Sequence, residues 1–465
     1  MELGLFEDTK EAAGDPRRQY PMSIVDSPPH RALAKQAAVE GVILLKNNNS
    51  TLPLAGAGMT AAATSMDLGG LAKKKKLAVV GPNANRTLTL TANYAGCKSS
   101  AGGPILPECT FVNPLQGITA AAKASDDWED EVAYSQGVDI DTLDTSGIAS
   151  AVAAAKDADY VIMVGGLITC QEVGFQCQEA EARDRSSPVQ CEKPGASCPD
   201  VGRDVGIGLP GKQLDLLKAL ATQTQTPIVL VIMSGSAVAT PWASSSNRVG
   251  AIVQHFYPGV LGGEALADVL FGIASPAGKL PVMIPVSEAQ LPRDYLNQSM
   301  QAPPGRTHRY FTETPLYPFG HGLGYSSMQY SGLTVSHESL AAGTVSLDSV
   351  VSVTVDVTNL GEYSRPADEV VMVFAKPTLR DEVTPAMSVP RQMLLGFTRI
   401  STQPGKTVRA TIEVKADKFR LLGAEGQYQL LHGEYELFVG GRAPGSEGAA
   451  TTDVSEPLRA TLRVV

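Results

Sequence analysis

The sequence predicts two folded domains, a parallel α/β sandwich followed by an all-β sandwich of immunoglobulin type. Two observations support this order. Strand-length apolar runs alternate with helical segments through roughly the first 290 residues, and strands of period two without helices follow from about Leu333. The chain of 465 residues is 43% hydrophobic and 18% charged, so both domains can bury cores, and a disordered or fibrous chain is excluded.

The first elements are a linker, a helix and a strand. Residues 1–30 are rich in Pro and charge and show no sustained hydrophobic period, which is typical of a linker. A helix is expected from His30 to Val42, because Ala, Lys, Gln and Glu are frequent there. Residues 42–47, VILLKN, are apolar and begin with β-branched side chains, which favours a buried strand.

The α/β domain is expected over residues 31–290. Its further strands are predicted at 77–82, 132–137, 160–166, 227–233 and 251–257, and its further helices at 148–158, 212–221 and 262–272. These strand runs are continuously apolar rather than alternating, as in YVIMVGG (160–166) and PIVLVIM (227–233). Such strands are covered on both faces, and their alternation with helices predicts a parallel sheet between two helical layers.

The composition and the hydrophobic pattern change in the last third of the chain. Residues 291–332 are dense in Pro, Gly and aromatics, so we expect this interdomain connection to pack against both domains rather than to act as a flexible linker. Residues 333–465 are expected to form the β-sandwich. VSVTVDVTNLG (351–361) alternates strictly, and RATIEV (409–414) and GEYELFVGG (433–441) follow between turn residues.

Charge and cysteine content narrow the function classes. A formal net charge of −10 argues against nucleic acid or an anionic membrane as a partner, and no apolar run is long enough to cross a bilayer. The first thirty residues lack the apolar stretch of a signal peptide. Six cysteines in three local pairs favour disulfides in an oxidising compartment, with free thiols as the alternative; they are Cys97, Cys109, Cys170, Cys177, Cys191 and Cys198. No spacing indicates a metal site.

Glycosylation sequons add slight weight to a secreted protein, since such three-residue patterns often arise by chance. They stand at Asn48, Asn49, Asn85 and Asn297.

Three further features do not indicate a functional site. Gly206, Gly208 and Gly211 spell GxGxxG, but the residues before them indicate a loop instead of a strand, so we expect Pro210 and Gly211 merely to start a helix. No GxSxG nucleophile elbow is present. His255 follows an apolar strand and is expected to be a satisfied core or rim residue.

The loop after YVIMVGG is the richest candidate site. It leaves the carboxyl end of a strand, where α/β sheets place ligands. It contains Glu172, Glu179, Glu181, Asp184 and Arg185. Crowded carboxylates raise one another's pKa, whereas an arginine lowers it, so one group can stay protonated as a general acid while another stays ionised. On the residues alone, a solvated acidic loop is the favoured alternative.

A resemblance to a known family favours a catalytic role for this loop over a solvated acidic loop. EAEARDR (179–185) resembles the acid/base loop of glycoside hydrolase family 3, in the plant and fungal β-xylosidase and α-L-arabinofuranosidase branch, with Ala182 where that branch usually has Gly. The similarity extends along nearly the whole chain. It includes AAVEGVILLKNNNSTLPL (37–54), YPGVLGGEALADVLFGIASPAGKLP (257–281), PLYPFGHGLGYSS (315–327) and GEYELFVG (433–440).

The resemblance implies a mechanism and site residues. Retaining hydrolysis of terminal β-xylosides or arabinosides, on the xylan side of carbohydrate metabolism, needs one carboxylate nucleophile and one acid/base. Glu179 is the first choice for the acid/base, because it occupies the first Glu of the motif. Glu181 is its neighbour in the motif, and Glu172 lies at the family's usual distance from the strand. Asp184 and Arg185 are expected to shape the loop or bind substrate. No metal or organic cofactor is implied.

The resemblance also implies a partner. In the family the nucleophile is an Asp on a preceding (β/α)8 barrel, and residues 1–30 resemble the tail of that barrel. We therefore expect this chain to carry half of an active site and to need a barrel in cis or in trans, in a secreted or cell-wall enzyme. Two alternatives remain: a non-catalytic carbohydrate-binding protein, and an interaction or scaffold protein derived from such an enzyme.

Overall fold

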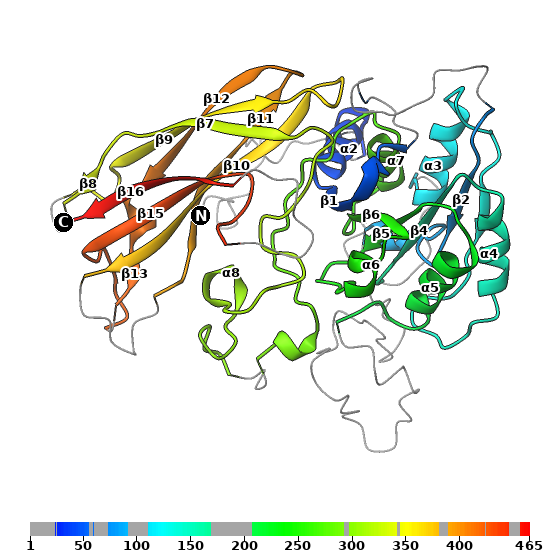
Figure 1. Cartoon of the computed structure of the whole chain (residues 1–465), viewed down its shortest axis with the longest axis horizontal. Coiled ribbons are helices and arrows are strands. Elements are labelled where there is room, and N and C mark those ends of the chain that lie inside the picture. The colour runs from blue at the N-terminus through cyan, green and yellow to red at the C-terminus, as the bar shows by residue number, and fades with distance from the viewer. Residues whose placement is uncertain are drawn as a thin grey trace, which may run out of the picture.

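The computed structural model describes residues 24, 26–54, 59, 73–91, 110–168, 207–292, 297–341, 345–380, 389–423, 425–445 and 456–465. It confirms an α/β domain followed by a β-sandwich, and Figure 1 shows the two side by side, with the segment around α8 (Thr307–Tyr310) between them.

The α/β domain is built on a six-stranded sheet with the order β1-β6-β5-β4-β2-β3. Its strands are β1 (Ile43–Asn47), β2 (Leu77–Val80), β3 (Ala133–Ser135), β4 (Tyr160–Gly166), β5 (Ile228–Met233) and β6 (Val249–Gln254). Five of them pair in parallel as predicted, but β1 pairs antiparallel with β6, so the sheet is mixed. An apolar run has no preferred direction, and the path by which the chain enters this edge decides it.

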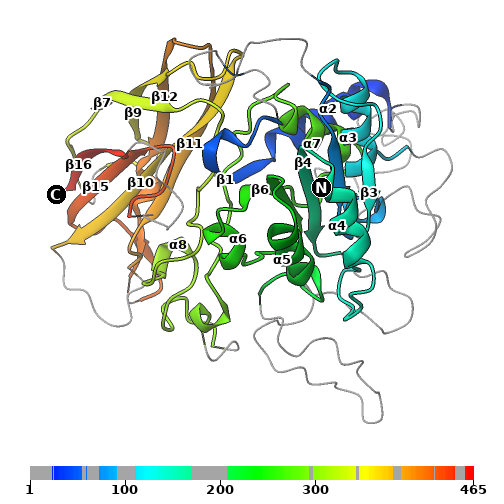
Figure 2. The same ribbon diagram turned by 45° about the vertical axis from the view of Figure 1, so that its right-hand side comes forward.

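Helices cover both faces of this sheet. One core lies between the sheet and α4 (Ile148–Lys156), α5 (Gln213–Gln223) and α6 (Pro241–Ser245). The other core lies under α3 (Pro114–Lys123) and α7 (Gly262–Leu270), with α2 (Pro28–Glu40) beside α7. Figure 2 shows the sheet between the two helical groups. The fully buried strands β4 and β5 explain why those runs are continuously apolar.

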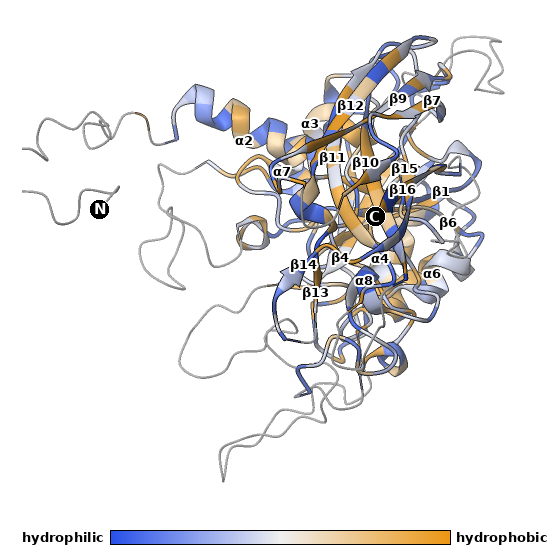
Figure 3. Ribbon diagram, turned by 90° about the vertical axis from the view of Figure 1, so that its left-hand side faces the viewer, coloured by the Kyte–Doolittle hydropathy of each residue, from blue (hydrophilic) through white to orange (hydrophobic). Residues whose placement is uncertain are grey.

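The β-sandwich has two main sheets and a small hairpin. The larger sheet has the order β11-β10-β15-β16-β8, the smaller one β12-β9-β7, and β13 pairs with β14. The strands are β7 (Met328–Val335), β8 (Ser339–Leu340), β9 (Val350–Asn359), β10 (Ala367–Leu379), β11 (Met393–Thr402), β12 (Thr407–Lys415), β13 (Leu421–Leu422), β14 (Tyr428–Gln429), β15 (Gly433–Gly440) and β16 (Leu458–Val464). Burial alternates along β9, and Figure 3 shows hydrophilic and hydrophobic residues alternating along β12.

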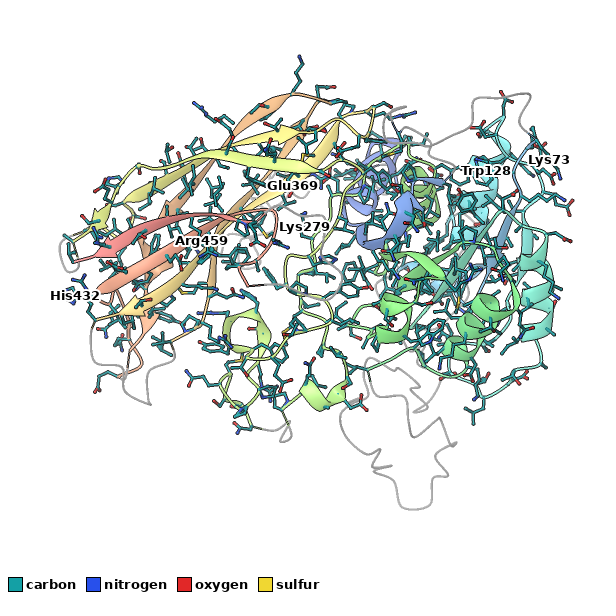
Figure 4. All side chains as sticks on the ribbon, in the orientation of Figure 1. Lys73, Trp128, Lys279, Glu369, His432 and Arg459 are labelled. Atoms are coloured by element: carbon teal, nitrogen blue, oxygen red, sulfur yellow. The ribbon has the colours of Figure 1, made fainter. Side chains whose placement is uncertain are left out.

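The two domains share buried polar contacts. Tyr363 donates a hydrogen bond from its hydroxyl to the carbonyl of Gly272, at 2.8 Å. Lys279, after α7, lies 3.2 Å from a carboxylate oxygen of Glu369 on β10, and Figure 4 labels both between the domains. Tyr330 donates to the same carboxylate at 2.8 Å.

The connecting segment contacts both sides, as expected from its composition. The backbone N–H of Leu323 donates to the carbonyl of Leu44 in the sheet domain, and that of Arg391 in the sandwich donates to the carbonyl of Arg309 in the segment. None of the helices in the described ranges combines the length and the apolar character needed to cross a bilayer.

Candidate functional site

The sheet has a topological switch point between β2 and β4. These strands are neighbours, yet the chain leaves β2 toward α3 on one face and leaves β4 toward α5 on the other. The carboxyl ends of such a strand pair frame a crevice, where open α/β sheets bind ligands. The acidic loop of the sequence starts at this point, directly after β4.

Two glycines allow the strand ends to approach closely. Gly81 follows β2 with φ +104°, and a Cβ atom there would lie 2.4 Å from the carbonyl oxygen of Val164. Gly166 ends β4 with φ +120°, and its Cβ would lie 2.1 Å from the carbonyl oxygen of Met233. Any side chain would clash with backbone at either position, so both strand exits require glycine.

Asn83 ties the turn after β2 to the start of the acidic loop. Its side chain is completely buried, and its Nδ2 donates to the carbonyl of Leu167 at 3.1 Å. Its backbone N–H donates to the carbonyl of Val164 at 3.1 Å, and Thr89 donates to its Oδ1 at 3.3 Å. The amide therefore fixes the exit of β4 from the side of β2.

Gln213, the first residue of α5, fixes the same exit from the opposite face. Its Oε1 accepts from the backbone N–H of Gly166 at 2.7 Å, and its Nε2 donates to the carbonyls of Gly166 and Ile140, both at 2.8 Å. The side chain is fully buried, and its three hydrogen bonds all join it to backbone groups of the protein. Sequence reasoning missed both Asn83 and Gln213, because their partners are distant in sequence.

The glycine-rich segment before α5 differs from its expected form. The helix begins at Gln213 instead of at Pro210, because Pro210 and Gly211 belong to a turn in which Gly211 has φ +57°. A Cβ at Gly211 would lie 2.8 Å from the backbone of Asp141, so close packing requires this glycine. This segment connects the acidic loop to α5.

Both ends of the acidic loop are anchored in one hydrophobic core. Leu167 and Ile207 are buried in the same cluster beneath α5. The N–H of Leu167 donates to the carbonyl of Met233, and the N–H of Ala239 donates to the carbonyl of Ile207, both at 2.7 Å. The chain thus leaves the sheet at β4 and returns beside the segment that follows β5.

The site residues predicted from sequence lie between these two anchors and outside the described residues. They are Glu172, Glu179, Glu181, Asp184 and Arg185. The six cysteines also lie outside the described residues, so their pairing stays a prediction. The structure therefore shows where the loop begins and ends, and the roles of its side chains remain predictions.

Polar side chains follow the carboxyl ends of β2 and β3. Asn113 donates to the exposed Asn85 at 3.0 Å, and Arg86 pairs with Asp139 at 2.9 Å. Burial raises the pKa of Tyr134, an effect that the charge of Arg86 opposes. Within the described ranges, no group of three or more His, Cys, Asp or Glu residues is arranged to hold a metal ion.

His255 directly follows β6. It is buried as expected, with its Nε2 2.9 Å from the carbonyl of Gly262. Its buried Nδ1 has no hydrogen-bond partner among the described residues, so the expectation of a satisfied histidine holds for only one ring nitrogen. Burial lowers its pKa to about 4, although the hydrogen bond to Gly262 opposes this shift. The imidazole is therefore neutral near pH 7 and belongs to the core.

The two domains match two known domain families. Residues 42–325 match the Glycosyl hydrolase family 3 C-terminal domain, and residues 369–443 match the Fibronectin type III-like domain. The first match covers more than half of the chain. The chain therefore belongs to glycosyl hydrolase family 3.

Relatives in this family carry the names of two kinds of glycosidase. The chain is 30% identical to "Probable beta-D-xylosidase 7" of Arabidopsis thaliana, over 94% of this chain and 52% of the relative. It is 31% identical to the "Periplasmic beta-glucosidase" of Salmonella typhimurium, over 94% of this chain and 52% of that relative. The chain thus spans about half the length of these curated relatives.

A solved structure shows the same architecture. The exo-β-xylosidase XlnD, in complex with a xylobiose aziridine activity-based probe, superposes with a TM-score of 0.72 and 26% sequence identity. The match covers 97% of this chain and 51% of that enzyme.

Proposed function

We propose that this chain supplies the acid/base half of a retaining glycosidase that hydrolyses terminal β-xyloside or arabinoside bonds. The observation that carries the proposal is the position of the acidic loop, which leaves β4 at the switch point of the sheet and is anchored there by Asn83 and Gln213. A loop held by buried hydrogen bonds at its base can present a carboxylate to a substrate above the crevice. The names of the family relatives support the reaction class.

The acid/base is proposed to be Glu179, with Glu181 and Glu172 as the alternatives. Neighbouring carboxylates would hold its proton at neutral pH, so that it can protonate the leaving oxygen and then deprotonate the attacking water. Asp184 and Arg185 are proposed to hold the shape of the loop, since Arg185 can pair with the carboxylates that stay ionised.

The nucleophile is proposed to come from a (β/α)8 barrel, in cis or in trans. Retaining chemistry requires two carboxyl groups at about 5 Å from each other on opposite sides of the scissile bond. The second carboxylate must be held as rigidly as the first, which a barrel strand end provides. The chain of 465 residues by itself should therefore be inactive.

An extracellular location and disulfides between the paired cysteines belong to the same proposal. They rest on the cysteine pattern and the sequons, and on the word periplasmic in the name of one relative. Mass spectrometry of the intact protein before and after reduction would count the disulfides.

The test begins with the purified chain of 465 residues and p-nitrophenyl β-xyloside. We expect no turnover; turnover by the chain alone would overturn the half-site proposal. The chain is then joined to the barrel of a xylosidase relative, and Glu179→Gln is compared with Glu131→Gln, an exposed glutamate after α3. Glu179→Gln should reduce hydrolysis of xylobiose by about 10²–10⁴-fold and that of the activated aryl xyloside much less, because the aryl oxygen needs little protonation.

Two further readouts separate an acid/base from a residue that only shapes the loop. Azide should restore turnover of Glu179→Gln and yield a xylosyl azide, because azide attacks the glycosyl-enzyme intermediate without general-base help. The basic limb of the pH–rate profile should also disappear. If Glu172→Gln or Glu181→Gln gives this pattern instead, the acid/base is that residue. If none does while sugars still bind, a non-catalytic carbohydrate-binding role replaces the proposal.

A further inference from the structure

A pocket lies between the connecting segment and the β-sandwich. Its volume is about 290 Å³, several times the roughly 30 Å³ that a water molecule occupies in the liquid. The connecting segment contributes His308, Glu313 and Phe319, and the sandwich contributes Lys376 and Gln392, with Arg391 preceding β11. The space is large enough for a single sugar ring.

Two cations face this pocket without a carboxylate partner among the described residues. Lys376, on β10, is half-buried, and its ammonium lies 4.9 Å from the centroid of the Phe438 ring. Arg391 is exposed, and its Nη1 donates to the carbonyl of Phe311 at 3.1 Å. No described ion pair includes either side chain. Both charges are therefore positioned and still available to an anion.

The wider neighbourhood adds positive charge. Burial lowers the pKa of Lys376, the carboxylate of Glu436 opposes that shift, and the charges of Arg391 and Arg459 reinforce it. Arg459, labelled on the sandwich in Figure 4, lies 5.2 Å from the centroid of the same Phe438 ring. Three cations, Lys376, Arg391 and Arg459, thus lie near two carboxylates, Glu313 in the lining and Glu436, which pairs with Arg459 at 3.7 Å. Holding like charges together costs free energy, which a bound anion offsets.

The remaining lining includes an aromatic pair that suits the ring of a sugar. The His308 and Phe319 rings stack with centroids 4.0 Å apart, and burial lowers the pKa of His308 to about 4, so its ring is neutral at pH 7. Gln392 donates from Nε2 to the carbonyl of His308, whereas its buried Oε1 has no hydrogen-bond partner within the described part of the chain. The hydrogen bond from Gln392 joins the sandwich side of the pocket to the connecting segment.

We propose that this pocket binds a uronic acid unit, with its carboxylate on Lys376 and Arg391 and its ring beside His308 and Phe319. The choice of a sugar acid over another anion rests on the proposed glycosidase function. The pocket would then recognise an acidic branch of an oligosaccharide.

The experiment is calorimetric titration of the full chain with sodium glucuronate, xylose, sodium acetate and sodium sulfate. Glucuronate should bind at least about tenfold more tightly than xylose, which lacks the charge, and than acetate or sulfate, which lack the ring. Lys376→Gln and Arg391→Gln should each weaken glucuronate binding about tenfold or more, since each removes a charged hydrogen bond. Glu313→Gln should strengthen it about twofold, because a like charge leaves the rim.

Controls keep this test decisive. Arg380→Gln removes an exposed arginine that does not line the pocket and should leave binding unchanged. Arg391 is itself exposed, and Lys376→Arg keeps the charge, so loss of binding in Arg391→Gln with retention in Lys376→Arg cannot come from misfolding. No glucuronate binding by the unmodified chain, equal binding by Lys376→Gln and Arg391→Gln, or equally tight binding of sulfate would overturn the proposal.

The titration involves no turnover, so it separates this inference from the proposed function. Glucuronate binding by a chain that remains inactive after a barrel is restored would overturn the glycosidase proposal and support the pocket. Turnover by the assembled enzyme without glucuronate binding would do the reverse.

Discussion

Replacing Gln213 with Met should destabilise the α/β domain and loosen the base of the acidic loop. Met has a similar length but can make none of the three hydrogen bonds that Gln213 makes to Gly166 and Ile140. Each bond contributes about 1 kcal/mol net, and the buried backbone groups left without partners add to the loss. The free energy of unfolding should therefore fall by about 3–5 kcal/mol.

The assay is urea unfolding followed by tryptophan fluorescence. The chain has two tryptophans, Trp128 and Trp242, and both lie in the α/β domain, so the signal reports on that domain alone. Gln36→Met is the matched control, because Gln36 is exposed on α2 and bonds only to Glu40 at 2.9 Å. If the two variants lose the same free energy within about 0.5 kcal/mol, the buried amide does not hold the strand exit and our reasoning fails.

Three further outcomes are expected. Lys279→Met should lower the free energy of unfolding in urea by about 3 kcal/mol, because it leaves the Glu369 carboxylate buried without its cation. The double variant Lys279→Met with Glu369→Met should recover most of that loss, and equal losses in the single and double variants would refute the reasoning. Stability should decline as pH falls from 6.5 to about 4, because burial lowers the pKa values of His255 and His321 to about 4 in the folded protein. The unfolded chain therefore takes up protons at a higher pH than the folded chain. An unchanged melting temperature across that interval would contradict this. Asn113→Ala should lower stability by about 1 kcal/mol by removing the capping box of α3, and Asn113→Asp should lose less; chemical denaturation measures both.

Local patterns predicted the elements well. The continuous apolar run YVIMVGG is strand β4 with the same bounds, and the strict alternation from residue 351 appears as buried Val351, Val353, Val355 and Val357 on β9. These predictions succeed because burial on one face or on both imposes a period on the residues themselves. The direction of β1 has no such period, and it was the part of the sheet that sequence reasoning had wrong.

The candidate site was predictable only in part. The sequence pointed to the loop after β4, since carboxylates after a strand end are a local signal. It could not show that Asn83 and Gln213 hold that loop, because their partners lie 84 and 47 residues away. A buried asparagine or glutamine looks like a surface residue in sequence until the fold brings backbone groups to it.

The sequence by itself determined the order of the two domains, the apolar strands and the acidic loop with its candidate glutamates. Only the tertiary structure decided that this loop starts at the switch point between β2 and β4, and that Lys376, Arg391 and His308 converge on one pocket from separate segments. The physical reason is the range of the interactions. Periodicity and turn chemistry act between neighbours in the chain, whereas buried hydrogen bonds and converging charges depend on which distant segments the packing brings together.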